Sequence, residues 1–231
     1  MAVKGFQGTS MLDFPQRVAS LVFYGGCNLR CPYCHNPTLV ENPNQYPDIP
    51  TEDILVMLEQ RRGFIDGVVI SGGEPTLDPH LDELLRQIKQ QKLQIKLDTN
   101  GLRPQVLESL LAQQLVDFVG LDLKTALPRY GELYHDDVDS SLLRESVVIL
   151  KQAQVEVEFR TTCVPGLVEE GDIRAIGELL CGEPLWVLQQ FVAQPAMDEE
   201  MRQLTPHSPE VLRSFVAIAE EYVERAMIRG I

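Results

Sequence analysis

Three cysteines lie within eight residues in the first part of the chain. Cys27, Cys31 and Cys34 form a CxxxCxxC pattern inside the segment GGCNLRCPYC. Cysteine thiolates are soft ligands that bind iron–sulfur clusters and zinc. A four-iron cluster with three cysteine ligands leaves its fourth iron available to an outside ligand. The spacing predicts a [4Fe-4S] cluster with one iron free for chemistry, and therefore a redox-dependent enzyme.

Two other metal groups could use the same residues. Zinc would take His35 as a fourth ligand, but adjacent ligands at Cys34 and His35 differ from the spaced patterns usual for zinc. The stretch CPYCH also has the spacing of c-type haem attachment, which would leave Cys27 without a role. On the cysteines alone, zinc and haem remain open, and His35 is expected to be a loop residue near the cluster.

Polar motifs end four further predicted strands. They read SGGEP at 71–75, DTNG at 98–101, LDLK at 121–124 and EFRTTCVPG at 158–166. Each has a purely structural reading as a tight turn or an ion pair; Arg160, for example, could pair with Glu156 or Glu158. Parallel α/β folds usually place their active sites at the carboxyl ends of the strands. We therefore expect these residues to lie at the same end as the cysteines.

The elements that would position these motifs alternate along the chain. Short apolar runs predict strands at 18–26, 67–73, 93–100, 118–124, 155–164 and 185–194. Helical periodicity predicts helices at 51–62, 81–91, 104–114, 141–153, 172–180 and 209–225. Thr51, Asp78 and Ser208 are the expected helix-start signals, and 35–50 is expected to be irregular. About six strand–helix units favour an α/β fold with an open parallel barrel.

Composition limits the classes of function. The 231 residues fit one domain, 1–231, and 34 acidic against 20 basic residues give a net charge of −14. Such a chain would repel nucleic acid, and no apolar run is long enough for a membrane span. No secretory signal precedes the first strand, so we expect a cytoplasmic protein. The remaining cysteines, Cys163 and Cys181, are expected to be buried apolar residues.

Taken together, the cysteines, the aromatic Tyr33 and the ordered strand-end motifs resemble the radical S-adenosylmethionine (SAM) superfamily. The resemblance implies a partial, open parallel barrel and a [4Fe-4S] cluster whose open iron is chelated by SAM. It also implies an enzyme that cleaves SAM reductively to a 5′-deoxyadenosyl radical. Such a cluster has a low potential, so flavodoxin or ferredoxin is the expected electron donor and the activity is expected to be anaerobic.

The resemblance also assigns roles to individual residues. The SGGEP turn is expected to bind the amino group of SAM. The polar residues at the ends of the other strands are expected to bind its carboxylate and its ribose. Asp98, Thr99 and Asp122 are also expected to hold a monovalent cation. Relatives carry a histidine against the adenine on the sixth strand, where this chain has Gln189 and Gln190, so no adenine contact is predicted there. The predicted SAM-binding residues are Tyr33, Gly72, Gly73, Glu74, Asp98, Thr99, Asn100, Asp122, Lys124 and Arg160.

Within the superfamily, the segment GTSMLDFP at 8–15 and the run CNLRCPYCHNP at 27–37 are similar to anaerobic ribonucleoside-triphosphate reductase activating proteins. This resemblance implies that the chain installs a glycyl radical on a partner reductase. Pyruvate formate-lyase or another glycyl radical enzyme is the alternative partner. A radical SAM enzyme that acts directly on a small molecule is the other reading.

Overall fold

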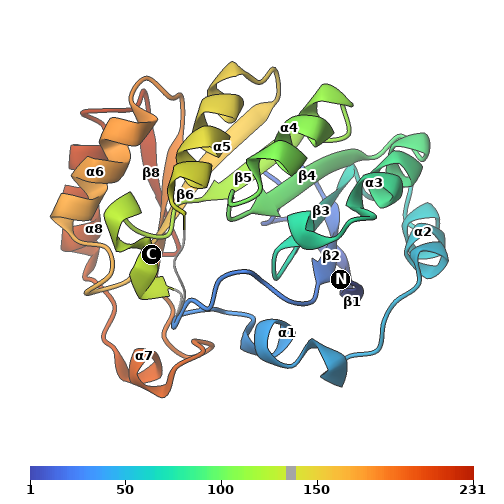
Figure 1. The fold of residues 1–231 in the computed structure, drawn as a ribbon, viewed down its shortest axis with the longest axis horizontal. Coiled ribbons are helices and arrows are strands. Elements are labelled where there is room, and N and C mark those ends of the chain that lie inside the picture. Colours follow the sequence, from blue (N-terminus) through green and yellow to red (C-terminus); the bar gives the residue numbers. More distant parts are fainter. Residues whose placement is uncertain (134–138) are drawn as a thin grey trace.

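A single curved sheet of eight strands forms the centre of the protein, in the order β1 to β8 (Figure 1). The computed structural model describes residues 1–133 and 139–231. β1 is antiparallel to β2, and every later strand is parallel to the one before it. The strands are β1 Val3–Ser10, β2 Ala19–Tyr24, β3 Gly67–Gly72, β4 Gln94–Thr99, β5 Phe118–Asp122, β6 Glu156–Cys163, β7 Trp186–Gln190 and β8 Ala226–Arg229.

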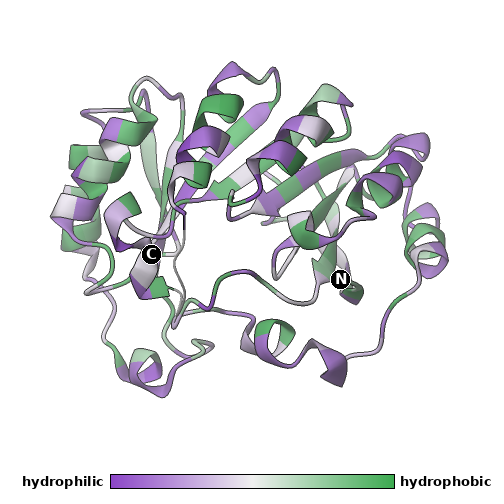
Figure 2. Cartoon of the chain, viewed as in Figure 1, coloured by the Kyte–Doolittle hydropathy of each residue, from purple (hydrophilic) through white to green (hydrophobic). Residues whose placement is uncertain are grey.

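Helices follow most of the parallel strands, and the longer ones cover the outer face of the sheet (Figure 1). They are amphipathic, with hydrophilic and hydrophobic residues alternating along each ribbon (Figure 2), as helices packed on a sheet require. The helices are α1 Pro37–Glu41, α2 Thr51–Glu59, α3 Leu81–Gln90, α4 Pro104–Ala112, α5 Ser141–Gln152, α6 Glu170–Leu180, α7 Glu199–Gln203 and α8 Pro209–Ala219. Three short 3-10 turns are η1 Pro43–Gln45, η2 Pro75–Leu77 and η3 Leu127–Leu133.

The sheet does not close, because β1 and β8 pair only with β2 and β7 in the sheet order. An apolar cluster fills the end of the barrel at which the parallel strands begin. Its members are Phe14, Ala19, Leu21, Val69 and Phe118. The rings of Phe14 and Phe118 meet edge to face with their centroids 5.7 Å apart. The polar side chains of the strand-end motifs therefore lie at the opposite end of the barrel, where the parallel strands end.

The predicted open α/β barrel is confirmed, and all six predicted strands are present as β2 to β7. Two strands were missed. β1 is an edge strand with two glycines and half-exposed side chains, so it lacks the apolar run that marks a buried strand. β8 is only four residues long, and the helix predicted at 209–225 ends earlier, at Ala219.

Three local predictions need correction. The segment 35–50 is not wholly irregular, because α1 and η1 lie within it. Thr51 is the first residue of α2 and makes no cap, and the N-cap of α3 is His80 rather than Asp78. The Ser208 cap is confirmed, since its hydroxyl accepts a hydrogen bond from the backbone N–H of Val211. In the part of the chain that the structure describes, no helix has the length and apolarity to span a membrane.

Candidate radical SAM site

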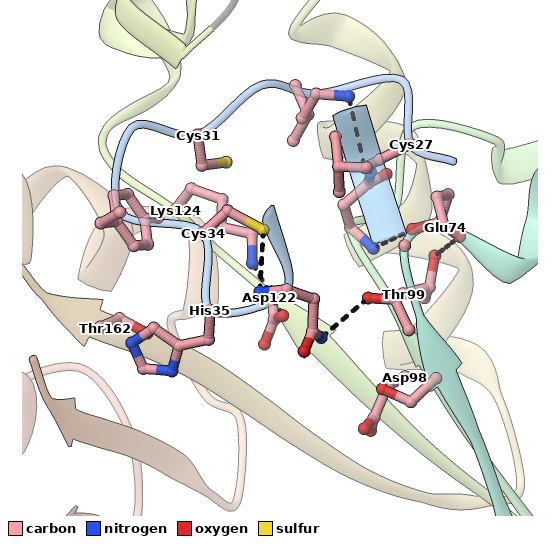
Figure 3. A pocket seen from close by; sticks show the side chains of 18 of the residues that line it. Cys27, Cys31, Cys34, His35, Glu74, Asp98, Thr99, Asp122, Lys124 and Thr162 are labelled. Atoms are coloured by element: carbon pink, nitrogen blue, oxygen red, sulfur yellow. Dashed lines mark hydrogen bonds and ion pairs between the residues drawn. The ribbon is translucent and has the colours of Figure 1, made fainter. Parts of the chain in front are cut away.

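A pocket of about 240 Å³ opens at the carboxyl ends of the parallel strands (Figure 3). The three cysteines and all ten predicted SAM-binding residues line it. The lining is Cys27, Leu29, Cys31, Tyr33, Cys34, His35, Asn36, Val40, Ser71, Gly72, Gly73, Glu74, Asp98, Thr99, Asn100, Asp122, Lys124, Arg160, Thr162 and Gln189. The expectation that these residues gather at one end is therefore confirmed, whereas their individual contacts to SAM stay predictions.

The cysteine loop presents its sulfur atoms among hydrogen-bond donors. The backbone N–H of Leu29 donates to Cys27 Sγ at 3.4 Å, and the backbone N–H of Asn36 donates to Cys34 Sγ at 3.4 Å. The side-chain amide of Asn100, from the end of β4, also lies 3.8 Å from Cys27 Sγ. Hydrogen bonds to sulfur stabilise thiolate charge and help to set the potential of an iron–sulfur cluster.

The same thiols carry raised pKa values. Burial raises the pKa of Cys27 to about 12, with the nearby Glu74 carboxylate adding to the effect. Burial likewise raises the pKa of Cys31 to about 11, partly offset by Lys124. Without metal these thiols are protonated at neutral pH, so iron must displace protons as the cluster assembles.

The residues present fit a cuboidal cluster. All the cysteines are free thiols, and three of them share one loop and one pocket. Within residues 1–133 and 139–231, no three His, Cys, Asp or Glu side chains converge on a single ion. A [4Fe-4S] cluster does not need such convergence, because each thiolate binds a different iron.

The turn after β3 packs directly on the turn that precedes Cys27. Gly72 has a φ of +115°, which favours glycine. The backbone N–H of Gly73 donates to the Tyr24 carbonyl, and that of Glu74 to the Gly26 carbonyl. A Cβ on Gly73 would lie 1.8 Å from the Gly26 oxygen. The two glycines thus allow a close backbone contact that fixes the SGGEP turn against the cysteine loop.

The carboxylate of Glu74 joins the ends of β3 and β4. It is 1% exposed and accepts hydrogen bonds from the Thr76 backbone N–H and hydroxyl, the Thr99 hydroxyl and the Asn100 backbone N–H. Burial raises the pKa of this carboxyl against the opposing effect of these donors. With its oxygens so engaged, the Glu74 side chain positions Thr99 and Asn100 on the pocket wall.

A network of ion pairs forms the base of the pocket. Arg160 donates from Nη1 to Asp98 Oδ1 at 3.0 Å and from Nε to Asp122 Oδ1 at 2.7 Å, while Lys124 Nζ lies 2.8 Å from Asp122 Oδ2. Burial alone would raise the pKa of Asp122, but the Arg160 and Lys124 charges outweigh it and hold that pKa well below its usual range. Lys96 Nζ also reaches Asp98 Oδ1, at 2.7 Å.

Arg160 does not form the alternative salt bridge with a glutamate of its own strand. Glu156 pairs with Arg17 and Glu158 with Arg229 of β8, which leaves Arg160 to the carboxylates of β4 and β5. Sequence reasoning missed Lys96. The available signal was a lysine two residues before Asp98 on the same face of β4, between the apolar residues Ile95 and Leu97.

His35 and Thr162 also line the pocket and lie near each other in Figure 3, and Gln189 is a further lining residue. Burial, and secondarily the Lys124 charge, lowers the pKa of His35. Cys163 is buried as expected, but the same expectation for Cys181 is wrong. Cys181 caps the end of α6 and is exposed.

The open barrel and the three-cysteine pocket define a radical SAM enzyme, and the chain belongs to the Radical SAM superfamily, whose model matches residues 21–179. Within this superfamily, the relatives of the chain identify it as a glycyl-radical-enzyme activase. It is 33% identical to the protein of Methanocaldococcus jannaschii named "putative glycyl-radical enzyme activating enzyme", over 99% of this chain and 96% of the relative. It is 27% identical to the pyruvate formate-lyase 1-activating enzyme of Escherichia coli strain K12, over 95% and 86%.

Solved structures agree at the level of the fold. SuiB of Streptococcus suis bound to SAM superposes with a TM-score of 0.68 and 16% identity. The match covers 91% of this chain and 52% of SuiB, so this chain spans about half the length of that neighbour. The expected cofactors, a [4Fe-4S] cluster and SAM, are those of the radical SAM superfamily to which the chain belongs.

Replacing Arg160 with lysine tests the ion-pair network. A lysine has one nitrogen and cannot bridge Asp98 and Asp122 as the guanidinium does. We expect the dissociation constant for SAM to rise about tenfold, which is about 1.4 kcal/mol, with the melting temperature little changed. Anaerobic equilibrium dialysis measures the affinity, and Arg174→Lys, on the surface of α6, is the matched control. Unchanged affinity in Arg160→Lys would contradict the role.

Proposed function

We propose that this chain activates an anaerobic ribonucleoside-triphosphate reductase by installing a glycyl radical on it, using a [4Fe-4S] cluster bound by Cys27, Cys31 and Cys34. The observation that carries the proposal is the single pocket that holds the three thiols and the polar ends of β3 to β6. When bound, the cluster and SAM supply a 5′-deoxyadenosyl radical, which takes a hydrogen atom from the target glycine. Reduced flavodoxin or ferredoxin provides the electron, and the reaction takes place in the cytoplasm.

The residues of the chain position the ligand and set the local charge. Lys124 and Arg160 place two cationic groups beside the pocket, where a ligand carboxylate can pair with them. The glycine turn at 72–73 brings backbone polar groups to the wall without side-chain bulk. Tyr33 lies between Cys31 and Cys34 in sequence, is 4% exposed and lines the pocket, so its ring contributes apolar surface to the wall.

The choice of partner rests on the segment at 8–15 and on the cysteine run, which resemble the reductase-activating proteins. The pyruvate formate-lyase activating enzymes among the relatives favour a second candidate partner, pyruvate formate-lyase. Both partners would accept the same chemistry at this site, so the two must be separated by experiment.

Anaerobic reconstitution with each partner tests the proposal. The chain is loaded with iron and sulfide, reduced, and mixed with SAM and either the reductase or pyruvate formate-lyase. We expect methionine and 5′-deoxyadenosine in both mixtures, and a glycyl-radical EPR doublet with the reductase only. A doublet with pyruvate formate-lyase alone would reassign the partner. SAM cleavage without a doublet in either mixture would reject the activase function.

A further inference from the structure

A buried lysine lies below the SAM pocket. Lys96 is 1% exposed and sits on β4 two residues before Asp98, so both side chains point to the same face of the sheet. Its Nζ lies 2.7 Å from Asp98 Oδ1 and 5.7 Å from the centre of the Phe118 ring. Lysine is almost never fully buried unless it is paired, because removing the ammonium from water is costly. Its position is thus tied to Asp98.

The carboxylates expected to hold a monovalent metal ion are already bound by side-chain cations. Asp98 Oδ1 is contacted by Lys96 and by Arg160 Nη1, and the two oxygens of Asp122 are contacted by Arg160 Nε and Lys124 Nζ. A hard metal cation binds through a shell of oxygen ligands. Most oxygens of this donor set already face a positive nitrogen, so the residues present do not fit such an ion.

The third member of the expected cation site is also engaged. The Thr99 hydroxyl donates to Glu74 at 2.8 Å and accepts from the backbone N–H of Gly101 at 3.1 Å. Its oxygen is therefore held within the turn after β4. A metal ion would have to break these bonds to use it.

The network already carries more positive than negative charge without a metal ion. Lys96, Lys124 and Arg160 carry three positive charges, and Asp98 and Asp122 carry two negative charges. The network is left with one positive charge, which one ligand carboxylate neutralises. An added alkali cation would restore an excess of positive charge in a poorly hydrated site, where repulsion between like charges is strong.

The backbone of β5 makes room for this arrangement. Gly120 pairs with Asp98 in the sheet register. A Cβ there would lie 2.6 Å from Asp98 Oδ1 and 3.0 Å from the Arg160 guanidinium carbon. The absence of a side chain at 120 therefore lets the guanidinium reach across β5 to β4.

We propose that the ammonium of Lys96, together with Arg160, serves as a built-in cation that replaces a monovalent metal ion beside Asp98 and Asp122. Lys96 is then a positioning residue: it holds the Asp98 carboxylate, and through it Arg160, in the arrangement that receives SAM. The inference rests on the proposed binding of SAM in this pocket. Its consequence is that SAM binding does not depend on sodium or potassium.

The first test measures SAM binding to the reconstituted protein by anaerobic equilibrium dialysis, in choline, sodium or potassium chloride at equal ionic strength. The wild-type dissociation constant is expected to vary by less than about twofold, because equal ionic strength gives equal screening. Lys96→Met is expected to bind about tenfold more weakly in choline and to regain affinity in potassium or sodium. Lys89→Met, which removes a surface partner of Asp117, should behave as the wild type.

A second readout needs no SAM. The melting temperature of the reconstituted wild-type protein should be the same in the three salts, whereas that of Lys96→Met should be lower in choline and rise with an alkali cation. If the wild-type affinity for SAM or the wild-type melting temperature increases with potassium, the inference is overturned. This comparison requires no variant. Failure of every alkali cation to restore a folded Lys96→Met also overturns it. If the wild type bound no SAM in any of the three salts, the proposed function would be rejected instead. The melting experiment would then still test whether Lys96 replaces a metal ion.

Discussion

Replacing Cys31 with alanine is expected to reduce the iron content of the reconstituted protein from about four per chain to near zero and to abolish SAM cleavage. Cys31 is the central ligand of the loop and is buried at the pocket. Two remaining thiols cannot hold a cluster that presents one open iron. Iron and sulfide analysis with the visible absorption of the anaerobic preparation measures the loss.

The matched control for this variant is Cys181→Ala. Cys181 is exposed at the end of α6 and does not line the pocket, so the iron content and SAM cleavage should stay at the wild-type level. If Cys31→Ala retained a full cluster and SAM cleavage, the ligand assignment would be wrong. If the wild-type protein bound one zinc ion and no iron, the zinc interpretation of the cysteine motif would be correct instead.

Replacing Gly73 with alanine is expected to damage both stability and cluster binding. The added Cβ would lie 1.8 Å from the Gly26 carbonyl oxygen, so the SGGEP turn and the cysteine loop must separate. Forced repacking of this kind costs about 1–3 kcal/mol, or about 2–4 °C of melting temperature for each kcal/mol in a chain of this size. Because Gly26 directly precedes the ligand Cys27, we expect the iron content to fall together with the stability.

Gly171→Ala is the control for this substitution. A Cβ at Gly171 meets nothing within 4 Å, and the residue lies in the first turn of α6, so alanine fits there without strain. Thermal unfolding followed by circular dichroism should therefore show a lower midpoint for Gly73→Ala and an unchanged or higher one for Gly171→Ala. Equal midpoints and equal iron contents in both variants would contradict the close contact.

The strands that position the site could be predicted from the sequence because β2, β3 and β5 are largely apolar runs, and β4 and β6 alternate apolar with polar residues. The residues that end them could be placed together because parallel strands finish at one end of a sheet. Neither argument applies to β1, which is an antiparallel edge strand, or to β8, whose four residues give too short a pattern. The sheet therefore has one more strand at each edge than the sequence predicts.

The pairing of charges inside the barrel could not be predicted. Glu158 and Arg160 lie on the same face of β6, so the sequence pattern allows them to pair with each other. In the fold, register places Arg160 opposite Asp122, its guanidinium lies over Gly120, and Glu158 pairs with Arg229 on β8. These partners depend on which strands are neighbours, and one of them belongs to a strand that was missed.

The apolar cluster around Phe14 and Phe118 also bears on the order of events during turnover. It fills the end of the barrel at which the strands begin, so SAM and its products exchange through the end at which the cysteines lie. A partner protein that presents its glycine must approach the same end. While docked, it would hold methionine and 5′-deoxyadenosine in place, so we expect the products to leave only after the activated partner has dissociated.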